Sequence, residues 1–352
     1  DGLKAMNIWP GFSIRTSLNK ERAGRREAIL LVSGVLLLVL AAASICMGAV
    51  PVTLRELAEA LTTGETATSA GRIIWFVRMP RTLAAILAGS ALAVSGAVLQ
   101  TVLNNPLASP SIIGVNAGSG LFTIALAAFF PGAVRYTPAA AFLGALFAVF
   151  AVYGIARKTG ASRMTIVLSG VAVSSFLSAF TDAILTFVPD TQMNRMAFLI
   201  GSFSGVSMDQ VRFAAGYILF GVAVSVVLSY DMNVLVLGEE TAASLGLRPG
   251  LYRMVFLVTA ALLAGSAVSF SGLIGFVGLI VPHAGRMLVG QDNRYLIPLC
   301  VLLGGAFTLG CDIIARVLFA PFELPVGIVM SFLGGPFFIY LLLSRKGRKS
   351  LD

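Results

Sequence analysis

The sequence contains one histidine, three cysteines and two tryptophans, and only 12% of its 352 residues are charged. An average soluble domain carries about twice that share of charged residues. Because His283 stands alone, a histidine-based metal site within the chain is not expected. The cysteines Cys46, Cys300 and Cys311 lie in separate apolar runs without metal-ligand spacing, and we interpret them as small core residues.

The sequence also has few of the patterns that enzymes require. No lysine directly follows a glycine, so the phosphate-binding loop signature is missing, and any nucleotide hydrolysis must occur on another chain. No acidic cluster suited to metal-assisted phosphoryl or prenyl chemistry lies on an apolar helix. An intramembrane hydrolase that uses His283 with the serines of "GSFSG", 201–205, stays open as an alternative, although the two are expected on opposite sides.

What the sequence has in abundance is apolar residues. They make up 57% of the chain, and the mean hydropathy is +0.92. This composition predicts an all-α polytopic membrane protein. The net charge of +9 does not indicate a nucleic-acid partner, because basic residues also follow from membrane topology.

Uncharged runs bounded by turn signals predict about ten transmembrane helices, since one span needs about 20 apolar residues. Residues 82–134 carry no charge, and "NNPLASPS", 104–111, divides them because its prolines interrupt a helix. The eighth span is the least regular, and residues 196–203 are expected as a short outer helix. The predicted spans are 28–50, 82–103, 112–130, 137–156, 164–188, 211–231, 251–270, 273–289, 296–318 and 325–343.

An even number of spans puts both termini on one side of the membrane. With the N-terminus inside, 17 of the 25 basic residues face the cytoplasm, which favours an N-in, C-in topology. The expected organisation is a basic cytoplasmic tail over 1–27 near the anionic inner leaflet, a permease domain over 28–345, and a cytoplasmic tail over 346–352. The polar stretch 232–250 is then cytoplasmic.

That stretch, "NVLVLGEETAASLGLRPG" over 233–250, contains a predicted short helix. Glu239 and Glu240 occupy its first turn, where carboxylates favour the positive end of the helix dipole. Ala242 and Ala243 are strong helix formers of small volume. Gly246 is placed to end the helix, and Pro249 discourages its continuation.

Several long motifs together resemble one family. "VRMPRTLAAILAGSALAVSGAVLQTVLNNPLASPSIIGVNAGSG", 77–120, "GLIGFVGLIVPHAGRMLVG", 272–290, and "CDIIARVLFAPFELPVGIVMSFLGGPFFIYLLL", 311–343, are similar to the FecCD family. Its members are membrane subunits of ATP-binding-cassette (ABC) importers for iron–siderophore complexes, heme and cobalamin. The resemblance implies a type II importer permease fold, and the span count agrees with it.

The resemblance also implies roles for particular residues. "LGEETAASLG", 237–246, resembles the family's coupling loop, in which a short cytoplasmic helix docks on the ATPase subunit. The implied coupling residues are Gly238, Glu239, Glu240, Thr241, Ala242, Ala243, Leu245 and Gly246.

Two further sets of positions follow from the same resemblance. Arg78, Arg81 and Arg316 match arginines that receive acidic residues of a substrate-binding protein, although snorkelling and an Asp312–Arg316 pair are alternatives for them. A cytoplasmic gate is implied at Asn105, Leu107, Ala161 and Ser162, with Ala161 departing from a hydroxyl residue at that place in a relative.

The implied mechanism is alternating access in a bacterial or archaeal cytoplasmic membrane. Two copies of this chain, or this chain and a paralogue, would enclose the path between them. Two ATPase subunits would hold ATP and Mg²⁺, an extracytoplasmic binding protein would deliver substrate, and this chain would hold no cofactor. Asp182, midway along a span, is a pathway candidate, and it would be the coupling carboxylate if the chain were instead an ion-coupled secondary transporter.

Overall fold

The computed structural model describes residues 10–48, 53–63, 68–158, 163–188, 198–318, 320 and 322–348. Every regular element in these residues is a helix. Seven helices are long and apolar enough to cross a membrane, and three shorter apolar helices accompany them. The ten are α1 (Pro10–Cys46), α4 (Met79–Val102), α5 (Val115–Phe129), α6 (Thr137–Lys158), α7 (Arg163–Phe187), α9 (Met208–Val227), α12 (Pro249–Ser271), α13 (Val277–Val289), α14 (Asn293–Val317) and α15 (Val326–Arg348). The all-α polytopic fold with about ten spans is thereby confirmed.

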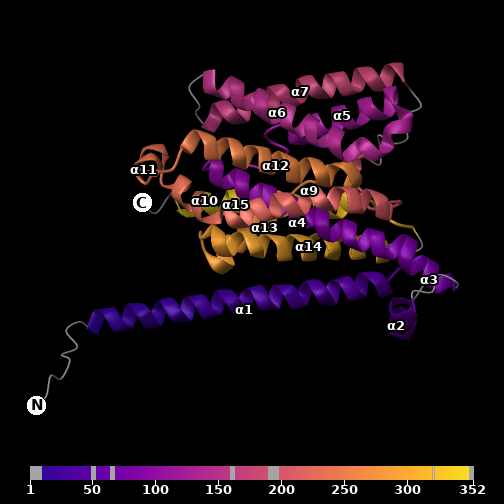
Figure 1. Ribbon diagram of the computed structural model, residues 1–352, viewed down its shortest axis with the longest axis horizontal. Helices are drawn as coiled ribbons and strands as arrows, with labels where there is room; N and C mark the ends of the chain where they lie inside the picture. The colour runs from indigo at the N-terminus through magenta and orange to yellow at the C-terminus, as the bar shows by residue number, and fades with distance from the viewer. Residues whose placement is uncertain are drawn as a thin grey trace, which may run out of the picture.

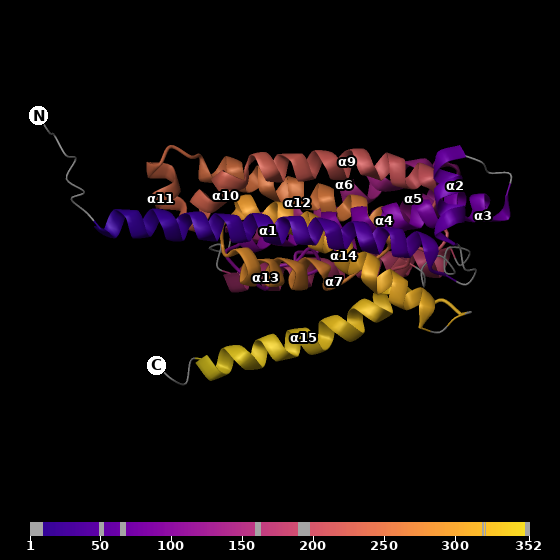
Figure 2. The ribbon, with the colours of Figure 1, turned by 90° about the horizontal axis from the view of Figure 1, so that it is seen from below.

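The long helices run along one common axis (Figures 1 and 2). The short helices α10 (Ser229–Val236) and α11 (Glu239–Ser244) lie at the end where α1 begins and α15 finishes, and α2 (Leu54–Thr63) and α3 (Ser69–Ile73) lie at the opposite end. From the distribution of lysine and arginine, the α11 end is the predicted cytoplasmic end. Figure 2 shows α15 diverging from the other helices along its length.

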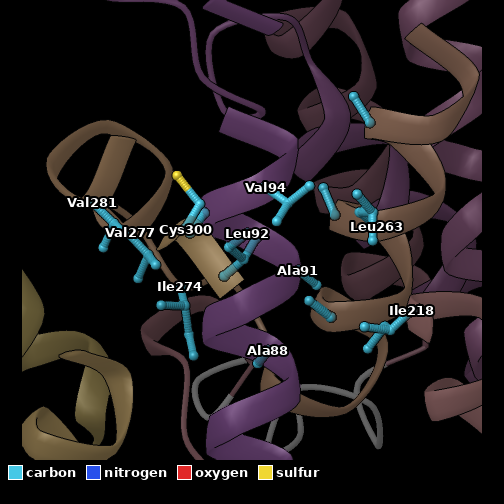
Figure 3. Packing of buried hydrophobic residues seen from close by; sticks show 14 of the residues in the cluster. Ala88, Ala91, Leu92, Val94, Ile218, Leu263, Ile274, Val277, Val281 and Cys300 are labelled. Carbon is cyan, nitrogen blue, oxygen red and sulfur yellow. The ribbon is translucent and has the colours of Figure 1, made fainter. Parts of the chain in front are cut away.

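Helix α4 lies at the centre of the bundle and is buried over most of its length. In Figure 3, Ala91 and Val94 face Ile218 of α9 and Leu263 of α12, while Cys300 of α14 and Val277 and Val281 of α13 lie on the other side. Helix α1, by contrast, is mostly exposed along its apolar stretch. The small residues of α4 allow several helices to surround it at once.

Glycine pairs bring the α4 backbone into direct contact with its neighbours. A Cβ atom added to Gly304 of α14 would overlap the carbonyl oxygen of Gly89. A Cβ atom added to Gly96 would overlap the carbonyl oxygen of Gly278 on α13. Neither contact leaves room for a side chain, so these glycines are required for the separation of the helices.

The second span begins earlier than the sequence predicts. A continuous helical stretch starts at Ser69 and includes the π-helical segment η1 (Ile74–Arg78) before α4. Pro80 lacks an N–H group and its ring occupies space in the preceding turn, which a wider π turn accommodates. Arg78 and Arg81 therefore lie within the helical stretch and not ahead of it.

Two other boundaries also differ from the prediction. Helix α1 begins at Pro10, so residues of the predicted tail continue the first span as helix. Residues 272–276 are not helical, and α13 begins only after Phe276, which has a left-handed φ of 65°. Of the predicted outer helix over 196–203, residues 198–200 are helical and 201–203 are not, while 196–197 lie outside the described residues.

The glycine contact between α4 and α14 can be tested within one helix. Gly304→Ala should destabilise the protein by about 1–3 kcal/mol, because the new methyl group meets backbone atoms of α4. Gly310→Ala, also on α14, is the matched control, since nothing lies within 4 Å of its added Cβ atom. Thermal unfolding in detergent should separate the two variants, and equal unfolding temperatures would contradict the proposed contact.

Candidate functional site

A buried cluster of charged side chains joins α4 and α14 near the outer end of the bundle. Arg81 of α4 donates two hydrogen bonds of 3.1 Å and one of 3.0 Å to the carboxylate of Asp312 on α14. Its third nitrogen binds Glu323, which precedes α15, at 2.6 Å. Asp312 is fully buried, and Glu323 is 38% exposed at its side chain. Arg81 is therefore paired with two carboxylates of its own chain.

The other two arginines hold the end of α1. Arg78 donates to the carbonyl oxygens of Ile45 and Cys46 at 2.6 and 2.8 Å. Arg316 donates to the carbonyl oxygens of Ser44 and Met47, both at 3.1 Å, and pairs with Asp312 at 3.1 Å. These bonds satisfy carbonyl groups that the last turn of a helix leaves without intrahelical partners.

This arrangement corrects the expected position of the three arginines. Arg78, Arg81 and Arg316 are only 5%, 6% and 4% exposed, and each already has acceptors within the chain. The Asp312–Arg316 pair considered from the sequence is present. Buried, paired guanidinium groups favour a structural role, and docking of a binding protein on them stays a prediction.

The cytoplasmic helix α11 has the form that the sequence predicts. Glu239 and Glu240 occupy its first turn, and Ala242 is fully buried. Gly246 has a φ of 88°, and the N–H groups of Gly246 and Leu247 bond back to the helix carbonyls of Ala243 and Ala242. Gly246 thus ends the helix in a left-handed conformation that glycine adopts without strain.

The two glutamates of α11 have different surroundings. Glu239 pairs with Arg253 of α12 at 2.5 Å. Glu240 is exposed, and no ion pair of it occurs among the described residues. Glu239 therefore connects α11 to a membrane-spanning helix, whereas Glu240 is available to a partner.

The loop that follows α4 contains two of the predicted gate residues. The side-chain oxygen of Asn105 accepts a hydrogen bond of 3.0 Å from the N–H of Leu107 and so stabilises the turn. A small hollow shows that this loop lies against Ile166 and Val167 at the start of α7. The other two predicted gate residues, Ala161 and Ser162, lie outside the described residues, directly before α7.

A polar hollow at the cytoplasmic end was not predicted from the sequence. It has a volume of about 570 Å³, lies between α4, α10, α13 and α14, and is lined in part by six carboxamide side chains. Clusters such as "NNP" at 104–106 and "QDN" at 291–293 at the ends of apolar runs were the available signal. The carboxamides are Gln100, Asn104, Asn105, Asn233, Gln291 and Asn293.

Asp182 and His283 take different positions. Asp182 is an exposed residue of α7 and lines a hollow of about 140 Å³ with Asn116 and Phe198 among others, so its assignment to the pathway stays a prediction. His283 of α13 is half-buried, and its ring lies edge-on to that of Phe337 on α15, with 6.0 Å between the centroids. That contact is a packing interaction between the two helices.

The seven long apolar helices and the three shorter ones define the class of this protein as a multi-pass membrane protein. The sequence profile of the FecCD transport family matches residues 36–344. The chain belongs to the FecCD transport family.

Relatives with known names agree with this assignment. The cobalamin import system permease protein BtuC of Halobacterium salinarum is 41% identical over 277 residues, which cover 78% of this chain and 74% of the relative. The Fe(3+)-citrate import system permease protein YfmD of Bacillus subtilis is 39% identical, covering 78% and 82%. The achromobactin transport system permease protein CbrC of Dickeya dadantii is 35% identical and covers 98% of both chains.

A solved structure shows the same arrangement of helices. A metal-chelate type ABC transporter in an inward-facing conformation superimposes with a TM-score of 0.78 at 29% identity, covering 90% of this chain and 99% of that chain. The similarity therefore extends over nearly the whole fold.

The buried charge cluster yields a stability prediction. Arg81→Ala should cost about 3 kcal/mol, near the lower end for breaking a buried ion pair, since Arg316 continues to hold Asp312. Arg55→Ala removes the exposed pair with Glu59 on α2 and should leave stability unchanged. Thermal unfolding in detergent measures both variants, and an unfolding temperature of Arg81→Ala equal to wild type would refute the structural role.

Replacing Arg81 with an acidic residue would not separate an effect on binding-protein docking from an effect on folding. A glutamate there would lie beside Asp312 and Glu323, so three carboxylates would share one buried site. A loss of binding-protein association in such a variant would report on folding as much as on docking.

Proposed function

We propose that this chain is the membrane-spanning permease subunit of an ABC importer and forms the path for an iron chelate or cobalamin. The observation that carries the proposal is the family match over 36–344, together with the cytoplasmic helix α11 within it. The chain itself catalyses no covalent step, and ATP is hydrolysed on a partner ATPase. The importer resides in the cytoplasmic membrane of a bacterium or archaeon.

The substrate and partners follow from the relatives. Their names include Fe(3+)-citrate, achromobactin and cobalamin systems, so a ferric chelate is the first candidate and cobalamin the second. A second permease subunit completes the path, and a homodimer is the simpler form. Two ATPase subunits and an extracytoplasmic binding protein complete the importer.

Exposed apolar surface supports the pairing of two permease subunits. On α7, Phe176, Phe180 and Phe187 are exposed, and on α15, Phe332 and Tyr340 are exposed. The hollow beside Asp182 opens between α5, α7 and residues 198–199 and 273. In the proposed dimer, part of this surface faces the second subunit and the central path, and the remainder faces lipid.

ATP-dependent uptake tests the function. Proteoliposomes that contain this chain, its ATPase and its binding protein should import a ⁵⁵Fe-labelled ferric siderophore with ATP, and a protonophore should not reduce the rate. Asp182→Asn should leave this ATP dependence intact. The ion-coupled alternative predicts the opposite result: uptake would need no ATP, would stop with the protonophore and would be lost in Asp182→Asn. Asp182 is the carboxylate concerned because it is exposed on a membrane-spanning helix.

The two glutamates of α11 should separate docking from transmission. Glu240→Lys should weaken co-purification of the ATPase, because it reverses an exposed charge at the start of α11. Glu239→Gln should retain the ATPase but lower uptake per ATP hydrolysed, because it removes the pair with Arg253. Co-purification and coupled transport assays measure these effects. Identical behaviour of the two variants would exclude the proposed division between them.

A further inference from the structure

A set of hydrogen bonds joins α10, the helix that leads into α11, to the first residues of α14. The Asn233 side chain donates to a carboxylate oxygen of Asp292 at 2.8 Å. Its oxygen accepts two bonds of 2.9 Å from Asn293, one from the backbone N–H and one from the side-chain amide. Asn233 thus bonds to both residues that begin α14.

The connection continues from α14 to the end of α4. Asn293 is 2% exposed, and its side-chain oxygen lies 3.4 Å from the hydroxyl oxygen of Thr101 in the last turn of α4, a hydroxyl that also donates to the carbonyl oxygen of Ala97 at 2.9 Å. The neighbouring residue, Gln100, supplies the carbonyl oxygen that accepts from the N–H of Asn105 at 3.0 Å. Asn105 in turn holds Leu107. The contacts of Asn233 therefore lead through Asn293 to the last turn of α4, directly before the predicted gate loop.

The orientation of the Asn233 amide is determined by its neighbours. Hydrogen bonding from the Arg294 side chain, aided by that from Asn233, lowers the pKa of Asp292 to about 2, so Asp292 is a carboxylate at physiological pH. A carboxylate only accepts hydrogen bonds, so the Asn233 NH₂ group must point toward it. The Asn233 oxygen then faces the N–H groups of Asn293.

The surroundings of this network leave room for movement. Asn233, Asn293, Thr101 and Asn105 all line the hollow of about 570 Å³, so this side of the network faces open space. The same turn of α4 is also bonded to α13, since Gln100 accepts from Arg286 and donates to the carbonyl oxygen of Gly278. A displacement of α10 can therefore act on the end of α4 through Asn233 and Asn293.

We propose that Asn233 is a positioning residue that transmits the displacement of α11 by the ATPase to the gate loop after α4. The inference rests on the proposed function. The hollow of about 570 Å³ then gives these side chains room to move during coupling. The Asn233–Asn293 contact is the step at which movement passes from the coupling segment to the membrane-spanning helices.

The test uses the assembled importer in proteoliposomes and measures substrate imported per ATP hydrolysed. Asn233→Ala should lower this ratio about tenfold, the scale on which losing one or two buried hydrogen bonds shifts an equilibrium. The ATPase should still co-purify, because α11 is unchanged. Asp231→Asn is the matched control on α10, since no side-chain hydrogen bond of Asp231 occurs among the described residues, and its ratio should equal that of wild type.

A reciprocal exchange distinguishes transmission from simple support of the fold. Asn233→Asp alone places two carboxylates together and should lower the ratio. Combining it with Asp292→Asn again places an amide NH₂ group opposite a carboxylate. The double variant should therefore recover most of the substrate imported per ATP hydrolysed. Should Asn233→Ala reach the membrane poorly, the Asn233→Asp variant and this pair decide the question.

The movement of the loop is measured directly with a Leu107→Cys reporter in a Cys46→Ser background, since Cys300 and Cys311 are buried. ATP should change the thiol-labelling rate several-fold in wild type and in the exchanged pair, but not in Asn233→Ala. Wild-type uptake without ATP dependence would overturn both the proposed function and this inference. ATP-driven uptake with an unchanged ratio and an unchanged labelling response in Asn233→Ala would overturn the inference alone.

Discussion

The direct contact of the α4 backbone with its neighbours is the constraint on which the rest of the structure depends. Gly89 meets Gly304, and Gly96 meets Gly278, so α13 and α14 approach α4 at backbone distance. In lipid, where apolar side chains gain little by leaving the solvent, such close packing supplies much of the association between helices. The position of α4 determines where the loop after Val102 lies, and with it the polar hollow at the cytoplasmic end.

The two ends of the bundle use charged and polar groups in different ways. At the outer end, Arg81 and Arg316 surround the fully buried Asp312, and a buried charge must be paired to be tolerated. At the inner end, Asn233 and Asn293 bond to each other as neutral amides beside an open hollow, and the carboxylate of Asp292 that Asn233 also contacts is paired with the exposed Arg294. The outer cluster therefore resists rearrangement, whereas the inner network can exchange partners at lower cost.

Much of the fold could be predicted, because a helix that crosses the apolar interior of a membrane needs an uncharged run of about 20 residues. The boundaries of α11 were also predictable, since the first-turn glutamates and Gly246 act locally. The environment of the arginines was not, because Arg81 and Asp312 are 231 residues apart and no local pattern pairs them. The same holds for the hollow, whose amides come from separate segments that meet only after the helices pack.

The way in which the end of α1 is held determines which substitutions the protein tolerates there. Arg78 and Arg316 hold its outer end largely through the main-chain carbonyl oxygens of residues 44–47. Every amino acid has this carbonyl group, whatever its side chain. At residues 45–47 the two arginines therefore recognise a helix terminus and not a particular side chain. Most neutral substitutions there leave the anchor in place. Arg316 cannot be exchanged for lysine in the same way, because one of its nitrogens bonds to the two carbonyl oxygens while the other two bond to the Ser44 hydroxyl and to Asp312.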